Sequence, residues 1–365
     1  MTDVVASAPG KLVLLGEYAV LEGAPAVTTA VDRRAVVRLR RRADGRCTVR
    51  APDVVDGVQP FRLGAGGLPD WTAAGPAAAR LNLVDEVLRG LADAGLGLAG
   101  GEGVELSLDT SAFFDLLGAS RQKLGLGSSA ALTVALTSAL VALAGQATAT
   151  ADRAGWLTRL LDLHRSFQGG QGSGVDVATS LCGGLLSYRL QGSDGRPDAT
   201  PLPWPAALHR AFIWSGNSAS TPKFLATLRD WRRASATHEA DYGVRMAALT
   251  DTAEAAVSAL VDGDAGGFLY CAGRYGRDLR ALGQASGVDI WSSAHEAIAA
   301  VAGRQDGVVY KPCGAGGGDV GVLFATDPDR LAAAVAQLAD AGFASVPLAV
   351  DPAGLRLEVT ESEDA

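Results

Sequence analysis

Apolar residues at the start of the chain fall into short runs that are separated by turns. The runs Lys-Leu-Val-Leu-Leu-Gly at 11–16, Tyr-Ala-Val-Leu at 18–21 and Ala-Val-Thr-Thr-Ala-Val at 26–31 are typical of strands in a sheet. Residues 104–109 show a similar pattern. Residues 63–75 are rich in Gly and Pro and predict a loop, whereas residues 76–94 have apolar side chains at helical spacing and stop before Gly95.

The middle of the chain contains the most apolar predicted helix. Residues 128–144 are mostly Ala, Leu and Val without charge and end before Gly145, so we expect a helix that is buried on most sides. A second helix is predicted over residues 152–167 and a strand over residues 180–190. Residues 191–205 then collect Gly and Pro, which predicts a boundary between two domains, residues 1–204 and 205–365.

The second half of the chain alternates strands with helices. Strands are predicted over residues 208–214, 307–311 and 320–325, and helices over residues 221–234, 238–262, 265–281 and 328–341. Residues 344–350 and 355–359, which are joined by Asp-Pro-Ala-Gly, predict a terminal hairpin. This order predicts a small α+β sandwich in the second domain and an α+β class for the whole chain.

Composition narrows the classes of partner. The 365 residues are 48% apolar and 20% charged. The net charge of −8 argues against a protein that binds nucleic acid or the surface of an anionic membrane. The sequence lacks a secretory signal pattern and a long uninterrupted apolar segment, and its four cysteines are far apart. We therefore expect a cytoplasmic protein with reduced thiols and small-molecule substrates. The sequence does not indicate its oligomeric state.

Arginine greatly outnumbers lysine in this sequence. Of 32 basic residues, 28 are arginine, and the lysines are Lys11, Lys123, Lys223 and Lys311. Lysine has a compact ammonium group on a flexible stem, whereas the arginine fork is planar. Chance and codon usage would scatter four lysines along the chain. Three of them instead lie on or beside glycine-rich segments.

The central glycine-rich segment has the composition of a phosphate site. It reads Lys-Leu-Gly-Leu-Gly-Ser-Ser-Ala at residues 123–130 and leads into the predicted apolar helix. A helix start offers unpaired N–H groups and a partial positive charge, and glycines let the backbone approach an anion. The segment lacks the Gly-Lys-Ser/Thr ending of a Walker A loop. The alternative is an ordinary glycine turn with a serine cap.

Two further segments carry similar features. Residues 7–21 place Lys11 at the start of a strand that ends in Gly-Glu-Tyr, and residues 311–319 read Lys-Pro-Cys-Gly-Ala-Gly-Gly-Gly-Asp. In this order the three segments resemble the motif set of the GHMP kinases, over most of the chain from Ser7 to about Ala325. The resemblance implies an N-terminal domain with a left-handed βαβ crossover, a C-terminal ferredoxin-like sandwich, and ATP bound between them.

Finer features resemble the phosphomevalonate kinase branch of the family, in its bacterial form. They are Gly-Glu-Tyr at 16–18, the 123–130 segment without a preceding proline, and the stretch from His164 to Asp176. The resemblance implies ATP-dependent phosphorylation of 5-phosphomevalonate to 5-diphosphomevalonate in isoprenoid synthesis. The alternatives are a mevalonate kinase, a sugar kinase, a related decarboxylase of a mevalonate phosphate, and a non-catalytic ligand sensor.

The resemblance also implies roles for single residues. Lys11 and Asp176 would be catalytic, and Ser129 would bind Mg²⁺. In related mevalonate kinases a metal-binding glutamate lies eleven residues before the aspartate, and that position is Arg165 here. The remaining expected ligands of ATP are Lys123, Gly125, Leu126, Gly127, Ser128, Ser129 and Ala130. Those of the acceptor are Lys11, Tyr18, Ser173, Gly174, Ser220 and Ala315.

Overall fold

A computed structural model describes residues 2–117, 120–146, 153–170, 172–191, 196–218 and 221–361 of the chain. The strands are β1 (Thr2–Leu15), β2 (Ala26–Arg42), β3 (Cys47–Arg50), β4 (Val58–Leu63), β5 (Pro69–Asp70), β6 (Gly103–Asp109), β7 (Phe114–Leu117), β8 (Ser120–Lys123), β9 (Leu185–Gln191), β10 (Arg196–Leu202), β11 (His209–Trp214), β12 (Val308–Pro312), β13 (Val320–Ala325) and β14 (Arg356–Glu361). The α-helices are α1 (Asn82–Asp93), α2 (Ser128–Leu143), α3 (Arg153–Phe167), α4 (Val175–Cys182), α5 (Thr221–Arg233), α6 (Ala236–Val261), α7 (Ala265–Ser286), α8 (Ser293–Ala302) and α9 (Pro328–Asp340). The 3₁₀ helices are η1 (Ala19–Glu22), η2 (Ala65–Gly67), η3 (Thr72–Leu81) and η4 (Ser111–Phe113).

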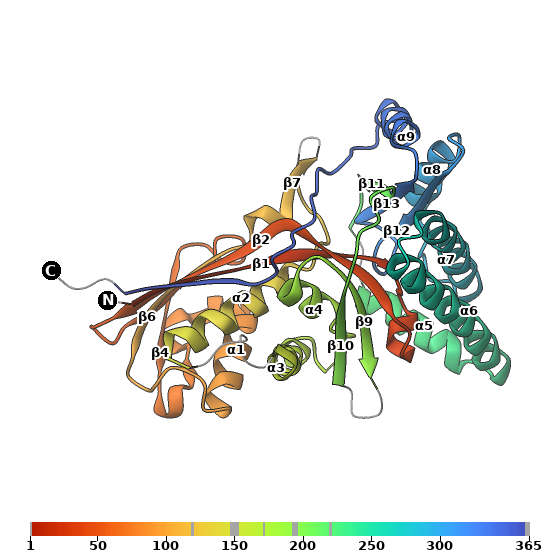
Figure 1. Cartoon of the computed structure of the whole chain (residues 1–365). Coiled ribbons are helices and arrows are strands. Elements are labelled where there is room, and N and C mark those ends of the chain that lie inside the picture. Colours follow the sequence, from red (N-terminus) through yellow and green to blue (C-terminus); the bar gives the residue numbers. More distant parts are fainter. Residues whose placement is uncertain are drawn as a thin grey trace.

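The first sheet is built around the long strand β2. This strand pairs antiparallel with β1, β6 and β9, and the sheet continues through β3, β4 and β5 on one side and β10 on the other. The last strand of the chain, β14, pairs antiparallel with β1, so that Thr2 lies opposite Glu361. Both termini therefore lie at the same end of the molecule (Figure 1).

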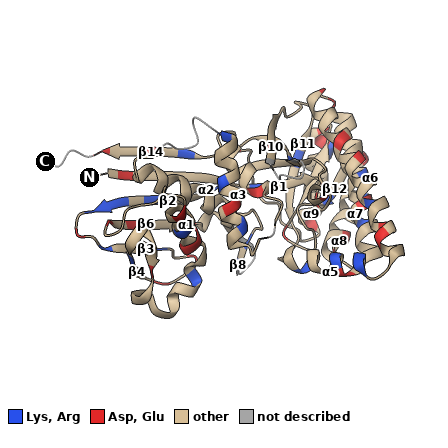
Figure 2. Cartoon of the chain, turned by 90° about the horizontal axis from the view of Figure 1, so that it is seen from below, with Lys and Arg blue, Asp and Glu red and all other residues tan. Residues whose placement is uncertain are grey.

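The second sheet has the order β11-β13-β12 and is entirely antiparallel. Helices α7, α8 and α9 pack against it, α5 and α6 pack against α7, and the long helices α6 and α7 lie side by side (Figure 1). Acidic and basic residues are interspersed along these two helices (Figure 2), with the pairs Arg245–Asp241 and Arg274–Asp278 one turn apart. Such i,i+4 pairs are typical of the solvent-facing side of a helix.

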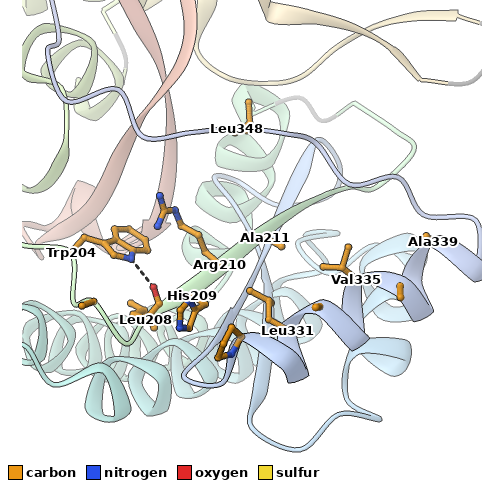
Figure 3. A pocket seen from close by; sticks show the side chains of 13 residues that line it. Trp204, Leu208, His209, Arg210, Ala211, Leu331, Val335, Ala339 and Leu348 are labelled. Carbon is orange, nitrogen blue, oxygen red and sulfur yellow. Dashed lines mark hydrogen bonds between the residues drawn. The ribbon is translucent and has the colours of Figure 1, made fainter.

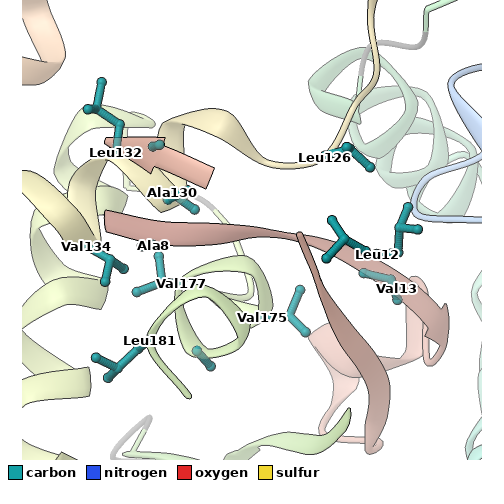
Figure 4. Packing of buried hydrophobic residues seen from close by; sticks show 14 of the residues in the cluster. Ala8, Leu12, Val13, Leu126, Ala130, Leu132, Val134, Val175, Val177 and Leu181 are labelled. Carbon is teal, nitrogen blue, oxygen red and sulfur yellow. The ribbon is translucent and has the colours of Figure 1, made fainter. Parts of the chain in front are cut away.

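Two helices pack against the first sheet with their amino ends beside β1. Helix α2 is buried on most sides, as the sequence predicts, and buried side chains such as Ala130 and Val134 face β1 together with Val177 of α4 (Figure 4). Gly10 makes this approach possible, because a β-carbon there would lie 2.8 Å from the carbonyl oxygen of Leu126. The amino ends of α2 and α4 are thereby brought beside Lys11 on β1.

The structure confirms the α+β class and most predicted elements, and it corrects several. The predicted strand at 18–21 is the 3₁₀ helix η1, because Gly16 and Tyr18 both take positive φ angles and turn the chain out of the sheet. The predicted strand at 180–190 begins as the end of α4. The predicted terminal hairpin is wrong, because residues 356–361 pair with β1 instead.

The division at residues 204 and 205 stays a prediction. The segment predicted as a linker contains β10, which extends the first sheet, and the next strand, β11, belongs to the second sheet. Within the described ranges, no helix combines the length and the hydropathy that a membrane span requires.

Candidate active site

Lys11 lies beside the loop that precedes α2. Its backbone N–H donates to the carbonyl oxygen of Leu126 at 2.8 Å, which holds β1 against the loop. The stem of its side chain runs along Gly127, where a β-carbon would lie 3.1 Å from Lys11 Cε and 3.7 Å from Asp176 Cβ. Only a residue without a side chain lets the loop, the lysine and the aspartate meet at this distance.

The amino end of α2 has the features of an anion site. Gly125 and Gly127 take φ angles of 69° and 75°, the left-handed region that glycine adopts without strain. Ser128 and Ser129 are the first helical residues, so the N–H groups of this turn have no partner within the helix. Leu126 and Ala130, two further expected ATP ligands, are fully buried, and neither is among the described residues that line the cavity at this helix end.

Asp176 occupies the first turn of the short helix α4. Gly174 precedes the helix with a φ angle of 79°, and the hydroxyl of Tyr188 donates to the carbonyl oxygen of Ser173 at 2.6 Å. The backbone N–H of Val177 donates to Asp176 Oδ1 at 3.0 Å, which orients the carboxylate. The aspartate therefore lies at a helix start beside Lys11, with one carboxylate oxygen bound by the backbone.

Two cavities meet at Lys11 and Asp176. The first, about 420 Å³, is also lined by Lys123, Gly125, Gly127, Ser128, Ser129 and Asp319. The second, about 210 Å³, is also lined by Tyr18, Ser173, Gly314, Ala315 and apolar side chains such as Val13 and Leu225. Gln168 and Thr221 belong to both cavities as well. The first cavity has the glycine-rich, hydroxyl-bearing wall of a phosphate site, and the second has the mixed wall of a small-molecule site.

The turn at the end of β1 joins the two sheets. The ammonium group of Lys311, on β12, donates to Glu17 Oε1 at 2.5 Å and to the carbonyl oxygen of Pro312 at 2.6 Å. Tyr275 on α7 donates to the carbonyl oxygen of Glu17, and Tyr18 donates to that of Ala315. The pKa of Glu17 is raised above its usual value, because the effect of burial outweighs the opposite effect of the Lys311 charge. Lys311 thus supports the structure and lies outside the two cavities' walls.

Sequence reasoning gave no role to Asp319, and the structure brings it to the phosphate cavity. A β-carbon on Gly125 would lie 2.3 Å from Asp319 Cγ, so the carboxyl group of the third glycine-rich segment touches the second segment. Asp319 has a φ angle of 56°, which is rare outside glycine. The available signal was a non-glycine residue that follows three glycines and directly precedes a predicted strand.

Other predicted residues are placed as follows. Lys123 is exposed at the rim of the phosphate cavity, and Lys223 is exposed on α5. Ser220 lies outside the described residues. Cys313 is buried, and burial raises the pKa of its thiol to about 12, so it stays protonated near neutral pH.

The oxygen-bearing side chains suit a magnesium ion that is shared with phosphate groups. Ser129, Asp176 and Asp319 line one cavity, and Mg²⁺ prefers oxygen ligands, of which it takes few from the protein when phosphates are present. Among the described residues, no group of three or more His, Cys, Asp or Glu side chains is arranged to hold a metal alone. The nucleotide would have to complete the metal's coordination.

A wider groove of about 730 Å³ lies beside the second sheet, between β11 and α9. Its wall includes Leu331 and Val335 (Figure 3), and the Trp204 indole N–H donates to the carbonyl oxygen of Leu208. The guanidinium of Arg210 lies 3.9 Å from the centre of the Trp204 ring. None of the residues that line this groove comes from the three glycine-rich segments.

Comparisons with known proteins identify relatives of this chain. The model of the GHMP kinases N terminal domain matches residues 82–184. The chain is 30% identical to the phosphomevalonate kinase of Streptomyces sp. strain CL190 over 88% of this chain and 89% of that protein. It is 29% identical to the mevalonate kinase of Thermococcus sibiricus over 62% of this chain and 61% of that protein.

Solved structures show the same fold. The Lin0012 protein from Listeria innocua superposes with a TM-score of 0.81 at 23% identity, over 99% of this chain and all (100%) of that one. Streptococcus pneumoniae phosphomevalonate kinase in complex with phosphomevalonate and AMPPNP superposes with a TM-score of 0.74 at 18% identity, over 95% and 99%. With the glycine-rich segments gathered around Lys11 and a relative aligned along nearly the whole chain, this protein belongs to the GHMP kinase family of ATP-dependent phosphotransferases.

Proposed function

We propose that this enzyme transfers the γ-phosphoryl group of ATP to 5-phosphomevalonate and produces 5-diphosphomevalonate. The observation that carries the proposal is that Lys11 and Asp176 line both the phosphate cavity and the smaller cavity beside it. A donor phosphate in the first cavity and an acceptor in the second would meet at these two residues. The phosphomevalonate kinase relative, which aligns over 88% of this chain, supports the choice of acceptor.

The proposed roles follow from the charges of the reactants. The second pKa of a phosphate monoester is about 6, so the acceptor is already an anionic nucleophile near neutral pH and needs no general base. Two anions must approach each other, which requires cations. In this scheme the ammonium group of Lys11 lies between the two phosphates and neutralises both.

Asp176 then has a positioning role. A second negative charge beside two phosphates is tolerated when it holds a cation in place. Lys11 is such a cation, because its side chain and that of Asp176 both lie against Gly127. The N–H groups of Gly127, Ser128 and Ser129 would bind the donor phosphates, and Lys123 would contact them from the rim. Bound Mg²⁺ would neutralise phosphate charge, with Ser129 as its protein ligand and Asp319 or Asp176 within the same cavity.

The acceptor wall of the proposal comprises Lys11, Tyr18, Ser173, Gly174 and Ala315. Ser220 completes it as a prediction outside the described residues. The apolar floor, including Val13 and Leu225, suits the methyl-bearing carbon chain of the acceptor.

The experiment that tests the proposal measures ADP release by the purified chain with mevalonate, 5-phosphomevalonate and a panel of sugars. We expect turnover with 5-phosphomevalonate and at least a hundredfold lower kcat/KM with the others, which corresponds to roughly 2.7 kcal/mol in transition-state binding. Release of carbon dioxide with a mevalonate phosphate would identify the decarboxylase alternative. Turnover with mevalonate alone would refute the choice of acceptor.

A further inference from the structure

His164 is a buried histidine that contacts the phosphate cavity through one neighbour. It lies in the last turn of α3, its side chain is 1% exposed, and its Nε2 atom lies 3.2 Å from Ser129 Oγ. Ser129 lines the phosphate cavity, whereas His164 is not among the described residues of its wall. A buried polar ring at this place needs a partner, and the partner is a predicted ligand of the nucleotide's metal.

Close contacts on both sides of α3 fix the rotation of this helix about its axis. A β-carbon on Gly90 of α1 would lie 2.2 Å from Leu163 Cδ2, and one on Gly174 would lie 1.9 Å from Leu161 Cδ2. Both leucines thus occupy space that a side chain would otherwise take. The helix cannot turn about its axis without losing these contacts, so His164 stays on the side of α3 that faces Ser129.

The hydroxyl proton of Ser129 can rotate, whereas the backbone of this residue is held in the helix. Its carbonyl oxygen accepts from Thr133 Oγ1 at 2.9 Å within the first turn of α2. A serine hydroxyl has one proton and two lone pairs, and the proton rotates to the best acceptor. If the proton points into the cavity, it opposes a cation there, whereas if it points to the imidazole, both lone pairs face the cavity.

We propose that His164 is a positioning residue, whose Nε2 atom accepts the Ser129 hydroxyl proton and turns the lone pairs of Oγ toward the magnesium nucleotide. The imidazole is then neutral, with its proton on Nδ1. This inference rests on the proposed function, because it requires the nucleotide phosphates to lie in the cavity at Ser129. Partners that orient a metal ligand in this way typically contribute roughly 10–100-fold to metal affinity.

The test compares ADP binding in the presence of Mg²⁺ and in EDTA, by calorimetry on the full chain. His164→Leu should weaken ADP binding in Mg²⁺ by roughly tenfold and leave binding in EDTA unchanged. His164→Gln should restore most of the affinity, because its amide oxygen can accept the same proton. Ser166→Ala is the matched control, since Ser166 lies in the same turn and donates to Glu86 on the exposed side.

A double-mutant cycle separates positioning from packing. If His164 acts through Ser129, adding His164→Leu to Ser129→Ala should cause no further loss of Mg²⁺-dependent affinity. Additive losses, equal losses in EDTA, or wild-type affinity in His164→Leu would overturn the inference. If His164→Leu does not fold, as judged by its melting curve, His164→Asn replaces it, because its amide is too short to reach Ser129. Failure of the wild-type chain to bind ADP would instead refute the proposed function, and the inference with it.

Discussion

The carboxyl group of Asp319 lies against the backbone of Gly125, so that a β-carbon on the glycine would be 2.4 Å from Asp319 Oδ2. Asp319 directly precedes strand β13 of the second sheet, and Gly125 belongs to the loop before α2. The contact therefore closes the phosphate cavity between the two sheets. The contact is possible because residue 125 is a glycine, whose side chain is a single hydrogen atom.

Gly125→Ala should disrupt this closure. The new methyl group would collide with Asp319, and the φ angle of 69° adds backbone strain of roughly 1 kcal/mol. We expect kcat/KM for ATP to fall by roughly tenfold or more, equivalent to about 1.4 kcal/mol. Gly145→Ala is the control, because Gly145 has a φ angle of 72° and no atom within 4 Å of its added β-carbon. Equal ATP kinetics in the two variants would contradict the proposed closure.

Lys11→Arg should retain folding and lose catalysis. Arginine keeps the charge, but its planar fork is longer and cannot follow the narrow path along Gly127. We expect kcat to fall by roughly 10²-fold, the scale seen when one group that stabilises developing charge is removed. The measurement is steady-state ADP release together with a melting curve. Lys223→Arg, an exposed change on α5, should keep full activity.

Lys311→Met should destabilise the chain. Lys311 and Glu17 have side chains that are 0% and 2% exposed, and removal of the lysine leaves a buried carboxylate without its partner. Loss of one member of such a pair costs roughly 3–5 kcal/mol, measurable by urea unfolding. The double variant Glu17→Gln/Lys311→Met removes both charges and should recover part of that loss. No recovery would show that the hydrogen bond to Pro312 matters more than the pair.

His295 should make stability depend on pH. Its Nε2 atom lies 3.2 Å from the carbonyl oxygen of Gly318 and its Nδ1 atom 2.7 Å from the hydroxyl of Tyr310, which suits a neutral ring that donates to the first and accepts from the second. Burial lowers its pKa from 6.5 to about 4. Between these values the unfolded chain takes up a proton here and the folded chain does not, so stability falls as the pH falls.

The size of this effect can be isolated with His295→Gln, whose amide can make both hydrogen bonds without titrating. From pH 6.5 to 4 the wild type should lose about 3 kcal/mol more than the variant. Urea unfolding at several pH values measures the difference. Parallel pH profiles for the two proteins would show that His295 keeps an ordinary pKa in the fold.

Local signals in the sequence were sufficient for much of this architecture. The apolar run after Gly127 predicts α2, and Asp327 with Pro328 predicts the start of α9, where the Asp327 side chain accepts from the N–H of Asp329. These features depend on neighbours within one turn of helix. The GHMP motifs likewise reside in contiguous segments, which is why Lys11, Gly127 and Asp176 could be named before their contacts were known.

Features that depend on distant segments could not be predicted. Pairing of β14 with β1 joins residues separated by nearly the whole chain, and the local sequence there favoured a hairpin instead. The contacts of Lys311 with Glu17 and of His164 with Ser129 join separate elements. Periodicity carries no information about such contacts, because both partners are compatible with many neighbours.

The return of β14 to the first sheet has a mechanical consequence. The chain passes from the first sheet to the second after β10 and passes back before β14. Two separate segments of backbone therefore connect the two sheets (Figure 1). Bodies linked at one point can swing in any direction, whereas bodies linked at two points turn about the line that joins those points. The two backbone connections, together with the contacts of Lys311 and Tyr275 with Glu17, restrict how the two sheets can move relative to each other.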